Sequence, residues 1–246
     1  MAAEDRAPAP TVVGPSLWRL GNPAKADASG LVGFGADLAV ETLVDAYRRG
    51  VFPWPHEGLA LPWFSPDPRG LLPVGSGATV SRSLRQRLRR CGWSTTVDAA
   101  FDVVVGACAD RPADGGTWIT PEMLQAYVDL HALGWAHSVE VWDGREMVGG
   151  LYGVRVGRCF TGESMFHREP DASKVAFVDL VARWREAGGS VVDVQIPTEH
   201  LASMGVKEAS RASFLRHLAQ VRDDVVHIAL GRRLVSRLAV AGGAPG

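Results

Sequence analysis

Apolar residues recur at the spacing of an α-helix in several segments, and the residues that flank these segments are typical helix ends. The segment 41–49 stops at Gly50, a residue that readily ends a helix. The segment from Thr120-Pro121 to Leu133 opens with a capping residue and a proline at the first helical position. Further helices are predicted over residues 99–109, 172–187 and 210–221.

Apolar runs with strand character lie between these helices. Strands are expected at residues 93–97, 137–142, 146–156, 158–165 and 190–195, with short strands near Val225 and Leu234. Asp143-Gly144 predicts a tight turn, so residues 137–165 are expected to form an antiparallel meander. The chain should therefore have a mixed α/β (α+β) fold with a mainly antiparallel sheet, and the order of its elements resembles the acetyltransferase-like (GNAT-type) fold.

Two domains are expected. Residues 15–70 contain one clear helix and little material for a core, which predicts a small N-terminal domain. The glycine-rich segment 70–77 is interpreted as a joint, and residues 71–240 as the larger catalytic domain. Residues 1–14 and 241–246 are expected to be loosely ordered.

The small domain carries a segment rich in aromatic residues and proline, AYRRGVFPW at 46–54 and PWFSPDPRG at 62–70. Proline cannot continue a helix or a central strand, so the rings are expected on a stiffened loop that presents them at fixed angles. Such a loop suits a flat ligand. The alternative is a loop whose rings pack over a core, as aromatic rings most often do.

Composition indicates an ordinary globular protein, because 46% of the 246 residues are hydrophobic and 22% are charged. The N-terminus lacks the features of a signal peptide, and no apolar run reaches the roughly 18 residues that span a bilayer. We therefore expect a cytoplasmic protein without a membrane partner. Cys91, Cys108 and Cys159 lie far apart without CxxC spacing, which predicts neither disulfides nor a zinc site.

The formal net charge of −1 argues against binding of nucleic acid over the whole surface. The segment 81–90 is nevertheless strongly basic, and it predicts an amphipathic helix that Ser81 can cap and that turns Leu84 and Leu88 to one side. The other side carries four arginines: Arg82, Arg85, Arg89 and Arg90. They could bind phosphates, or they could form an ordinary solvated face.

Three polar residues near strand ends are candidates for catalysis. Glu163 ends the meander, where a carboxylate needs a partner. Asp193 and Gln195 are two residues apart, so both are expected on one face of the sheet, with Val192 and Val194 on the other. Asp193 could then orient Gln195, or hold an incoming ammonium and help to accept its proton. The alternatives are a structural ion pair for Glu163 and ordinary polar strand ends.

Several common catalytic motifs are absent. No HxxxH, GxSxG or GxxxxGK[ST] occurs, so nothing supports a metal hydrolase, a serine hydrolase or a nucleotide-triphosphate site. No cofactor or metal is therefore expected. His200, which follows the last long strand, is interpreted as a capping or packing residue.

Eight motifs in register carry a resemblance to a known family. After AYRRGVFPW and PWFSPDPRG come GTWIT at 116–120, HSVEVW at 137–142, GGLYGV at 149–154, GESMF at 162–166, ASK at 172–174, and DVQ at 193–195 with HLASMG from His200. Over residues 31–220 the chain resembles the leucyl/phenylalanyl-tRNA–protein transferase family.

The resemblance implies an enzyme that moves Leu or Phe, and less readily Met, from aminoacyl-tRNA to the α-amine of a protein beginning with Arg or Lys. In bacteria this transfer marks the acceptor for degradation through the N-degron route. No cofactor is implied, because the aminoacyl ester is already activated. We also expect a monomer.

The resemblance further implies roles for single residues. Asp193 and Gln195 would be the relay at the reaction centre, with Glu163 in the same site. The residues implied at the aminoacyl-adenosine end are Tyr47, Trp54, Trp118 and Tyr127, and those near the apolar side-chain pocket are Met165 and Phe166. The four arginines would bind acceptor-stem phosphates. Pro197-Thr198-Glu199 departs from relatives that carry Asn-Asp there, so no contact is carried over to that turn.

Two other functions remain open from the residues. An acetyl-CoA-dependent acetyltransferase would share the fold, but such enzymes hold pyrophosphate on a glycine-rich turn, [RQ]xxGx[GA], and residues 167–172 lack those glycines. A non-enzymatic RNA-binding protein could use the basic helix and the aromatic segment. Such a protein would give no function to Glu163, Asp193 and Gln195.

Overall fold

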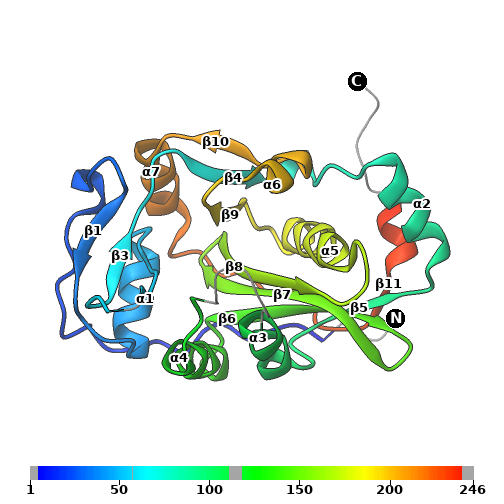
Figure 1. The fold of residues 1–246 in the computed structure, drawn as a ribbon, viewed down its shortest axis with the longest axis horizontal. Coiled ribbons are helices and arrows are strands. Elements are labelled where there is room, and N and C mark those ends of the chain that lie inside the picture. The colour runs from blue at the N-terminus through cyan, green and yellow to red at the C-terminus, as the bar shows by residue number, and fades with distance from the viewer. Residues whose placement is uncertain (1–4, 57, 111–117, 240–246) are drawn as a thin grey trace.

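The computed structural model of the protein describes residues 5–56, 58–110 and 118–239, which form two β-sheets covered by helices (Figure 1). The helices are α1 (Val40–Arg48), α2 (Arg82–Arg90), α3 (Phe101–Ala109), α4 (Pro121–Ala132), α5 (Ala172–Glu186), α6 (Glu199–Ser203) and α7 (Arg211–Val221), with the 3₁₀ turns η1 (Pro23–Lys25), η2 (Val74–Ser76) and η3 (Val235–Ala239). The strands are β1 (Leu31–Phe34), β2 (Phe52–Pro53), β3 (Pro62–Phe64), β4 (Arg69–Pro73), β5 (Ser94–Val97), β6 (Ala136–Asp143), β7 (Glu146–Val156), β8 (Cys159–His167), β9 (Val191–Gln195), β10 (Lys207–Ala209) and β11 (Arg233–Leu234).

The larger sheet has eight strands in the order β10-β4-β9-β8-β7-β6-β5-β11. Every neighbouring pair is antiparallel except β8 and β9, which are parallel. The predicted meander is β6–β7–β8, and Gly144, with φ 57°, allows the tight turn after β6. The mixed fold with a mainly antiparallel sheet is thus confirmed.

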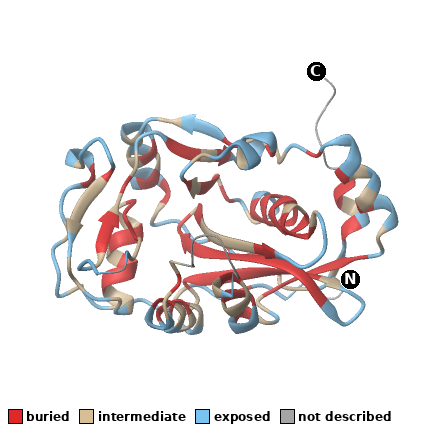
Figure 2. Cartoon of the chain, in the orientation of Figure 1, coloured by how far each residue is buried: buried red, intermediate tan, exposed pale blue. Residues whose placement is uncertain are grey.

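Helices cover both faces of this sheet. In Figure 1, α5 lies on one face of β6, β7 and β8, and α3 and α4 lie on the other. Figure 2 shows that buried residues concentrate along these strands and along α5. α5 is buried almost all round because it packs on the sheet and also against η2 and η3, and its buried polar residues include Asp179 and Arg183.

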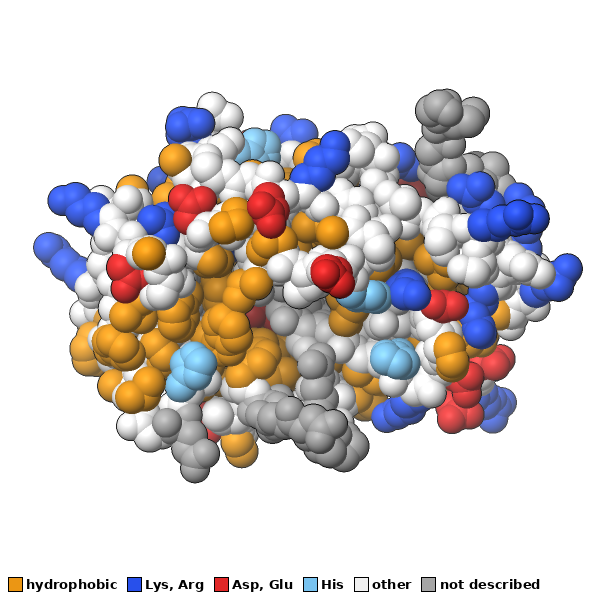
Figure 3. Space-filling view, turned by 45° about the horizontal axis from the view of Figure 1, so that its top comes forward, with side chains coloured by type: hydrophobic (Ala, Val, Ile, Leu, Met, Phe, Trp, Pro, Cys, Tyr) orange, Lys and Arg blue, Asp and Glu red, His pale blue; other side chains and the backbone are white. Residues whose placement is uncertain are grey.

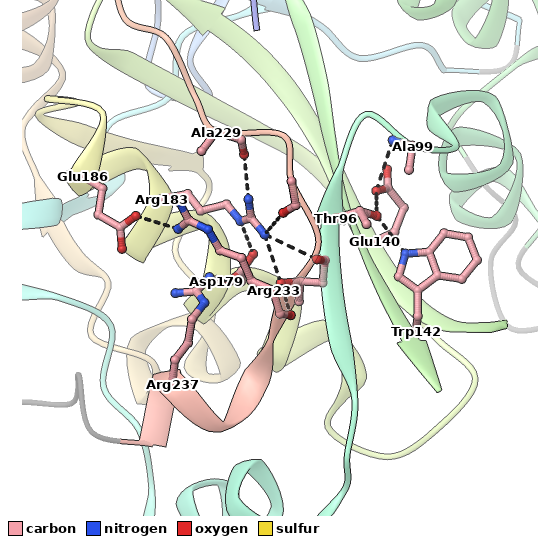
Figure 4. A network of polar contacts seen from close by, with 12 residues as sticks. Thr96, Ala99, Glu140, Trp142, Asp179, Arg183, Glu186, Ala229, Arg233 and Arg237 are labelled. Atoms are coloured by element: carbon pink, nitrogen blue, oxygen red, sulfur yellow. Dashed lines mark hydrogen bonds and ion pairs between the residues drawn. The ribbon is translucent and has the colours of Figure 1, made fainter. Parts of the chain in front are cut away.

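A buried ionic network fastens the C-terminal part of the chain to α5 (Figure 4). The Arg183 and Asp179 side chains have no exposed surface and form an ion pair of 2.7 Å. Arg183 also donates to the carbonyl oxygens of Ala229 at 2.6 Å and Gly231 at 2.9 Å, and Arg237 of η3 pairs with Asp179. The charges of Arg183 and Asp179 are therefore paired where no water reaches them, while Arg237 is partly exposed.

The smaller sheet has the order β1-β3-β2 and packs with α1. Residues 52–53 and 62–64, predicted to lie in a loop, are in fact short strands. Pro53 ends an edge strand and Pro62 begins β3, which are positions where proline removes no essential hydrogen bond. Trp63 is fully buried and donates from Nε1 to the Gly35 carbonyl at 2.6 Å, so part of the aromatic segment is core, as the alternative interpretation has it.

Three expectations about ordering were wrong. The supposed joint at 70–77 contains β4, which lies inside the larger sheet between β10 and β9. Residues 5–14 are not loose: Ala7 is buried, and its N–H donates to the Ile228 carbonyl at 2.8 Å. Val225 is exposed and forms no strand. The division into domains 15–70 and 71–240 stays a prediction, and residues 1–4 and 240–246 lie outside the described part of the chain.

Candidate active site

Four side chains from four different elements form a continuous chain of hydrogen bonds. The Tyr47 hydroxyl of α1 lies 2.8 Å from the Tyr127 hydroxyl of α4. Tyr127 donates to Glu163 Oε2 of β8 at 2.8 Å, and Gln195 Nε2 at the end of β9 donates to Glu163 Oε1 at 2.8 Å. Glu163 is thus held from two sides. Its two carboxylate oxygens bind Tyr127 and Gln195, so the alternative of an ion pair with a nearby arginine is not observed.

Glu163 has a pKa suited to proton transfer near neutral pH. Burial raises the pKa of Glu163 to about 7, although the hydrogen bonds from Tyr127 and Tyr47 act in the opposite direction. The pKa values of Tyr47 and Tyr127 are raised well above the ordinary value, first by burial and then by the nearby Glu163 charge. Both tyrosines therefore stay protonated and act as hydrogen-bond donors, while Glu163 can gain or lose a proton.

Asp193 is enclosed in an ion pair with Arg69. Arg69 Nε donates to Asp193 Oδ1 at 2.8 Å and Arg69 Nη2 to Oδ2 at 2.7 Å, and the two side chains are 1% and 0% exposed. Arg69 also donates to the Gly50 carbonyl, and its guanidinium lies 4.4 Å from the centre of the Phe214 ring. Asp193 is therefore a fixed internal charge that no solvent reaches in this structure.

Asp193 also determines the backbone of Gln195. Its Oδ1 accepts the Gln195 N–H at 2.9 Å, and Gln195 adopts a left-handed conformation with φ 62°. The register of β9 against β4 shifts at the same place. The alternation predicted for β9 consequently fails at its end, because Gln195 lines the same cavity as Val192 and Val194, whereas Asp193 does not.

A cavity of about 350 Å³ opens beside Glu163 and Gln195. The pairing of β8 with β9 ends at Thr161 and Asp193, and beyond this point the cavity lies between the two strands. Its apolar wall consists of Leu151, Met165, Phe177, Leu180, Val192, Val194 and Leu201. A volume of this size with a few converging polar groups is typical of a site for a small apolar moiety.

The predicted aromatic and apolar site residues occupy different places. Tyr47 and Tyr127 are buried behind Glu163, so they reach the site through their hydroxyls. Trp118 and Met165 line the cavity, while Phe166 is buried beside it and lines the neighbouring groove. The motif match at 116–117, just before Trp118, lies outside the described residues.

Trp54 belongs to the small sheet and does not line the cavity. Its ring lies 5.7 Å from that of His56 and 5.8 Å from that of Phe64, measured between centroids. Figure 3 shows that hydrophobic side chains gather at this end of the molecule. The positioning role of Trp54 stays a prediction.

α2 forms as the sequence predicts. The Ser81 hydroxyl accepts the Leu84 N–H, and Leu84 and Leu88 are buried. Arg82, Arg85, Arg89 and Arg90 line a shallow hollow on the outside of the helix together with Gln86. In Figure 3, Lys and Arg side chains gather at this end of the molecule, opposite the small sheet.

Arg69 is the residue that sequence reasoning missed. It lies in the PDPRG segment that was assigned to the aromatic loop, and nothing nearby in the sequence shows that its partner is Asp193, 124 residues away. The available signal was Asp193 itself, because a carboxylate on a buried strand needs a cation.

No metal or membrane feature emerges in the described ranges. Among these residues, no group of three His, Cys, Asp or Glu side chains is arranged to hold a metal ion. Each helix in this part of the chain is too short or too polar to cross a bilayer.

Comparison with known proteins gives consistent matches. A family model described as leucyl/phenylalanyl-tRNA protein transferase matches residues 72–219, and the model of the N-terminal domain of that family matches residues 36–67. The leucyl/phenylalanyl-tRNA–protein transferase of Anaeromyxobacter dehalogenans strain 2CP-C is 51% identical over 205 residues, which cover 82% of this chain and 88% of that protein. The protein of the same name from Pseudomonas fluorescens strain Pf0-1 is 48% identical over 205 residues, which cover 83% of this chain and 90% of that protein.

A solved structure also matches part of the fold. It is that of L-PGS from Bacillus licheniformis, with a TM-score of 0.38 and 14% identity, and the match covers 62% of this chain and 51% of that chain.

The Asp193 ion pair should support the fold much more than an exposed pair does. Asp193→Ala leaves the Arg69 charge buried without a partner, so the free energy of unfolding is expected to fall by about 3–5 kcal/mol. The matched control is Asp223→Ala, which removes an exposed carboxylate paired with Arg48 and should cost about 1 kcal/mol or less. Urea unfolding followed by circular dichroism measures both, and equal small losses would contradict the role given to Asp193.

Proposed function

The chain belongs to the leucyl/phenylalanyl-tRNA–protein transferase family and is an aminoacyltransferase, and we propose that it moves Leu or Phe, and less readily Met, from tRNA to proteins that begin with Arg or Lys. The transfer would mark these acceptors for degradation. The observation that carries the proposal is the apolar cavity with Glu163 and Gln195 on its wall.

The cavity suits an apolar aminoacyl side chain. Its wall of Leu, Val, Met and Phe residues favours Leu and Phe, since burying a charged side chain there would cost far more than leaving a methylene unfilled. A difference of one methylene changes binding by only about 1–3 kcal/mol. Limited use of Met beside Leu and Phe is therefore compatible with this wall.

The reaction is the aminolysis of an ester. The α-amine nitrogen of the acceptor forms a bond to the carbonyl carbon, the bond from that carbon to the ribose oxygen breaks, and the amine proton ends on the ribose oxygen. The ester is already activated, so the protein has to hold the amine in its neutral form and to carry this proton.

Glu163 is the group best placed to carry the proton. It lines the cavity, and its pKa of about 7 lies close to that of an α-amine, which is about 8 in solution. Gln195 donates its Nε2–H to Glu163, which turns its carbonyl oxygen away from that carboxylate and toward an incoming amine. Both groups can thus contact the reacting nitrogen.

Asp193 acts in this proposal as a positioning residue. Its two oxygens are engaged by Arg69, and one of them holds the Gln195 N–H. It therefore orients Gln195 through the backbone, which is the first of the two roles considered for it. An ammonium bound directly to Asp193 would have to displace Arg69.

The arginines on the outer side of α2 supply the electrostatic part of tRNA binding. A row of cations on a capped helix suits the phosphates of an RNA helix, which is recognised mostly by shape and backbone. This contact needs little sequence preference. It also makes the affinity depend on salt concentration.

The transfer itself can be tested with purified components. The protein should transfer labelled Leu or Phe from charged tRNA to a peptide with N-terminal Arg, without added metal or nucleotide, and a panel of charged tRNAs should rank Leu and Phe above Met and above charged amino acids. The control acceptor is the same peptide with an acetylated N-terminus, which has no free amine. Absence of transfer, with a known transferase active in parallel, would refute the proposal.

The pH dependence tests the role of Glu163. The rate should already fall below about pH 8, because the acceptor α-amine becomes protonated, and a second acidic limb should begin below about pH 7, because protonated Glu163 no longer accepts a proton. Glu163→Gln is expected to lose this acidic limb and to lower kcat by about 10²- to 10⁴-fold. Glu199→Gln, which changes an exposed carboxylate at the start of α6, serves as the control and should leave the profile unchanged. Glu163→Gln should keep only the limb of the acceptor amine, and a second limb near pH 7 that persists in this variant would assign the proton transfer to another group.

The salt dependence of tRNA binding tests α2. Arg82 and Arg89 are exposed, so Arg82→Ala with Arg89→Ala should leave the fold intact and weaken binding. The slope of log K against log salt concentration should become shallower by about 1.4–1.8, or about 0.7–0.9 per lost phosphate contact. The charge-preserving control, Arg82→Lys with Arg89→Lys, should keep most of the slope. An unchanged slope in the alanine variant would place tRNA elsewhere.

A further inference from the structure

A second hollow adjoins the reaction cavity and has no part in the function described so far. It measures about 870 Å³ and shares Met165 and His200 with the cavity, so the two are continuous. Its wall follows the end of β8 from Met165 to His167, continues over Arg168, and then reaches the first turn of α5 with Ser173 and Lys174. We call this hollow the α5 groove.

The α5 groove leads from the cavity toward α2. Asp171, at the start of α5, lines it and forms an ion pair of 3.3 Å with Arg87 of α2. β8 is extended between Glu163 and His167, a distance of about 13 Å at about 3.3 Å per residue. A short, extended ligand chain that lies in this groove could therefore connect the cavity with the arginines of α2.

Hydrogen-bond donors and positive charge line the α5 groove. The donors are the side chains of His167, Arg168, Lys174 and His200. The groove also contains Asp110 and Asp171, but Asp171 is already paired, with Lys174 at 2.8 Å and with Arg87. Among the lining residues, the cations Arg168 and Lys174 equal the carboxylates Asp110 and Asp171 in number, and Arg87 of α2, which pairs with Asp171 from outside the groove, adds one positive charge nearby.

Arg168 is held in place before any ligand arrives. Its Nη1 donates to the Met147 carbonyl at 2.9 Å, and its guanidinium lies 5.5 Å from the centre of the Phe166 ring. A guanidinium fixed in this way loses little freedom on binding and retains further N–H donors. It is a preformed contact for an anion.

We propose that the α5 groove binds the sugar–phosphate backbone of the single-stranded 3′ end of the donor tRNA, with Arg168 and Lys174 on its phosphates. This inference rests on the proposed function, because the aminoacyl ester must lie at Glu163. Basic side chains that follow the backbone along a groove are the general way in which proteins hold single-stranded nucleic acid. The acceptor protein is a poor alternative occupant, since its N-terminal Arg or Lys would be repelled by Arg168 and Lys174.

Three donors of increasing length separate the parts of this binding path. Aminoacyl-adenosine carries no phosphate, aminoacyl-cytidyl-cytidyl-adenosine reaches the groove but not α2, and aminoacyl-tRNA reaches both. Each is to be used with wild-type protein and with Lys174→Ala, Arg168→Gln and Arg82→Ala/Arg89→Ala. Lys207→Ala, which changes an exposed lysine on β10, is the matched control.

We expect Lys174→Ala and Arg168→Gln to raise KM about tenfold for the trinucleotide donor and for tRNA, the effect of one charge-assisted hydrogen bond, and to leave aminoacyl-adenosine unchanged. The α2 variant should weaken tRNA alone, and Lys207→Ala should change none of the three. The ion pair of Lys174 with Asp171 is only partly buried, so its loss should cost about 1 kcal/mol or less of folding stability.

The opposite results would overturn the assignment. An unchanged KM for the trinucleotide donor in both groove variants would show that the 3′ end runs elsewhere. A raised KM for the acceptor peptide instead of the donor would give the groove to the acceptor. Failure of the wild-type protein with every donor would refute the proposed function itself, a result distinct from these two.

Discussion

The buried ion pair between Arg69 and Asp193 is the contact on which the geometry of the site depends. It joins β4 to β9, and Arg69 extends it to the Gly50 carbonyl after α1 and to the Phe214 ring of α7. Either of these two buried charges would be strongly unfavourable without its partner, so Arg69 and Asp193 must stay in contact in the folded protein. The pair therefore holds β4, β9, α7 and the segment after α1 in one arrangement around Gln195.

The site opens where this fixed core ends. β8 and β9 pair only as far as Thr161 and Asp193, and the cavity occupies the space beyond. Glu163 stands at its edge, desolvated enough for a pKa of about 7. The same burial has a cost: the contribution of Glu163 to stability declines as the pH rises from about 4.3, its unfolded pKa, through about 7, because the charged form is favoured in the unfolded chain. Such a residue is expected where function, not stability, requires it.

Long elements with clear ends were predictable from the sequence, and short or proline-containing ones were not. The helices α1, α2, α4, α5 and α7 and the meander β6–β8 lie where apolar spacing, caps and Gly144 placed them. β2, β3 and β4 were assigned to loop or linker because proline or glycine interrupts them. These strands form because neighbouring strands supply the hydrogen bonds and Trp63 supplies a buried side chain, and both are tertiary effects.

The sequence by itself determined the fold class, the basic helix and, through eight motifs in register, the family. It also made Glu163, Asp193 and Gln195 candidates, weakly from their places at strand ends and more specifically through the resemblance to the family. Only the tertiary structure decided how these three side chains are paired. Asp193 is buried in an ion pair with Arg69. Gln195 has a left-handed backbone conformation, and its side chain donates a hydrogen bond to Glu163. The partners lie 32 and 124 residues apart in the sequence. Their pairing depends on the packing of distant elements and on the need to satisfy buried charge, and the spacing of neighbouring residues carries no information on either.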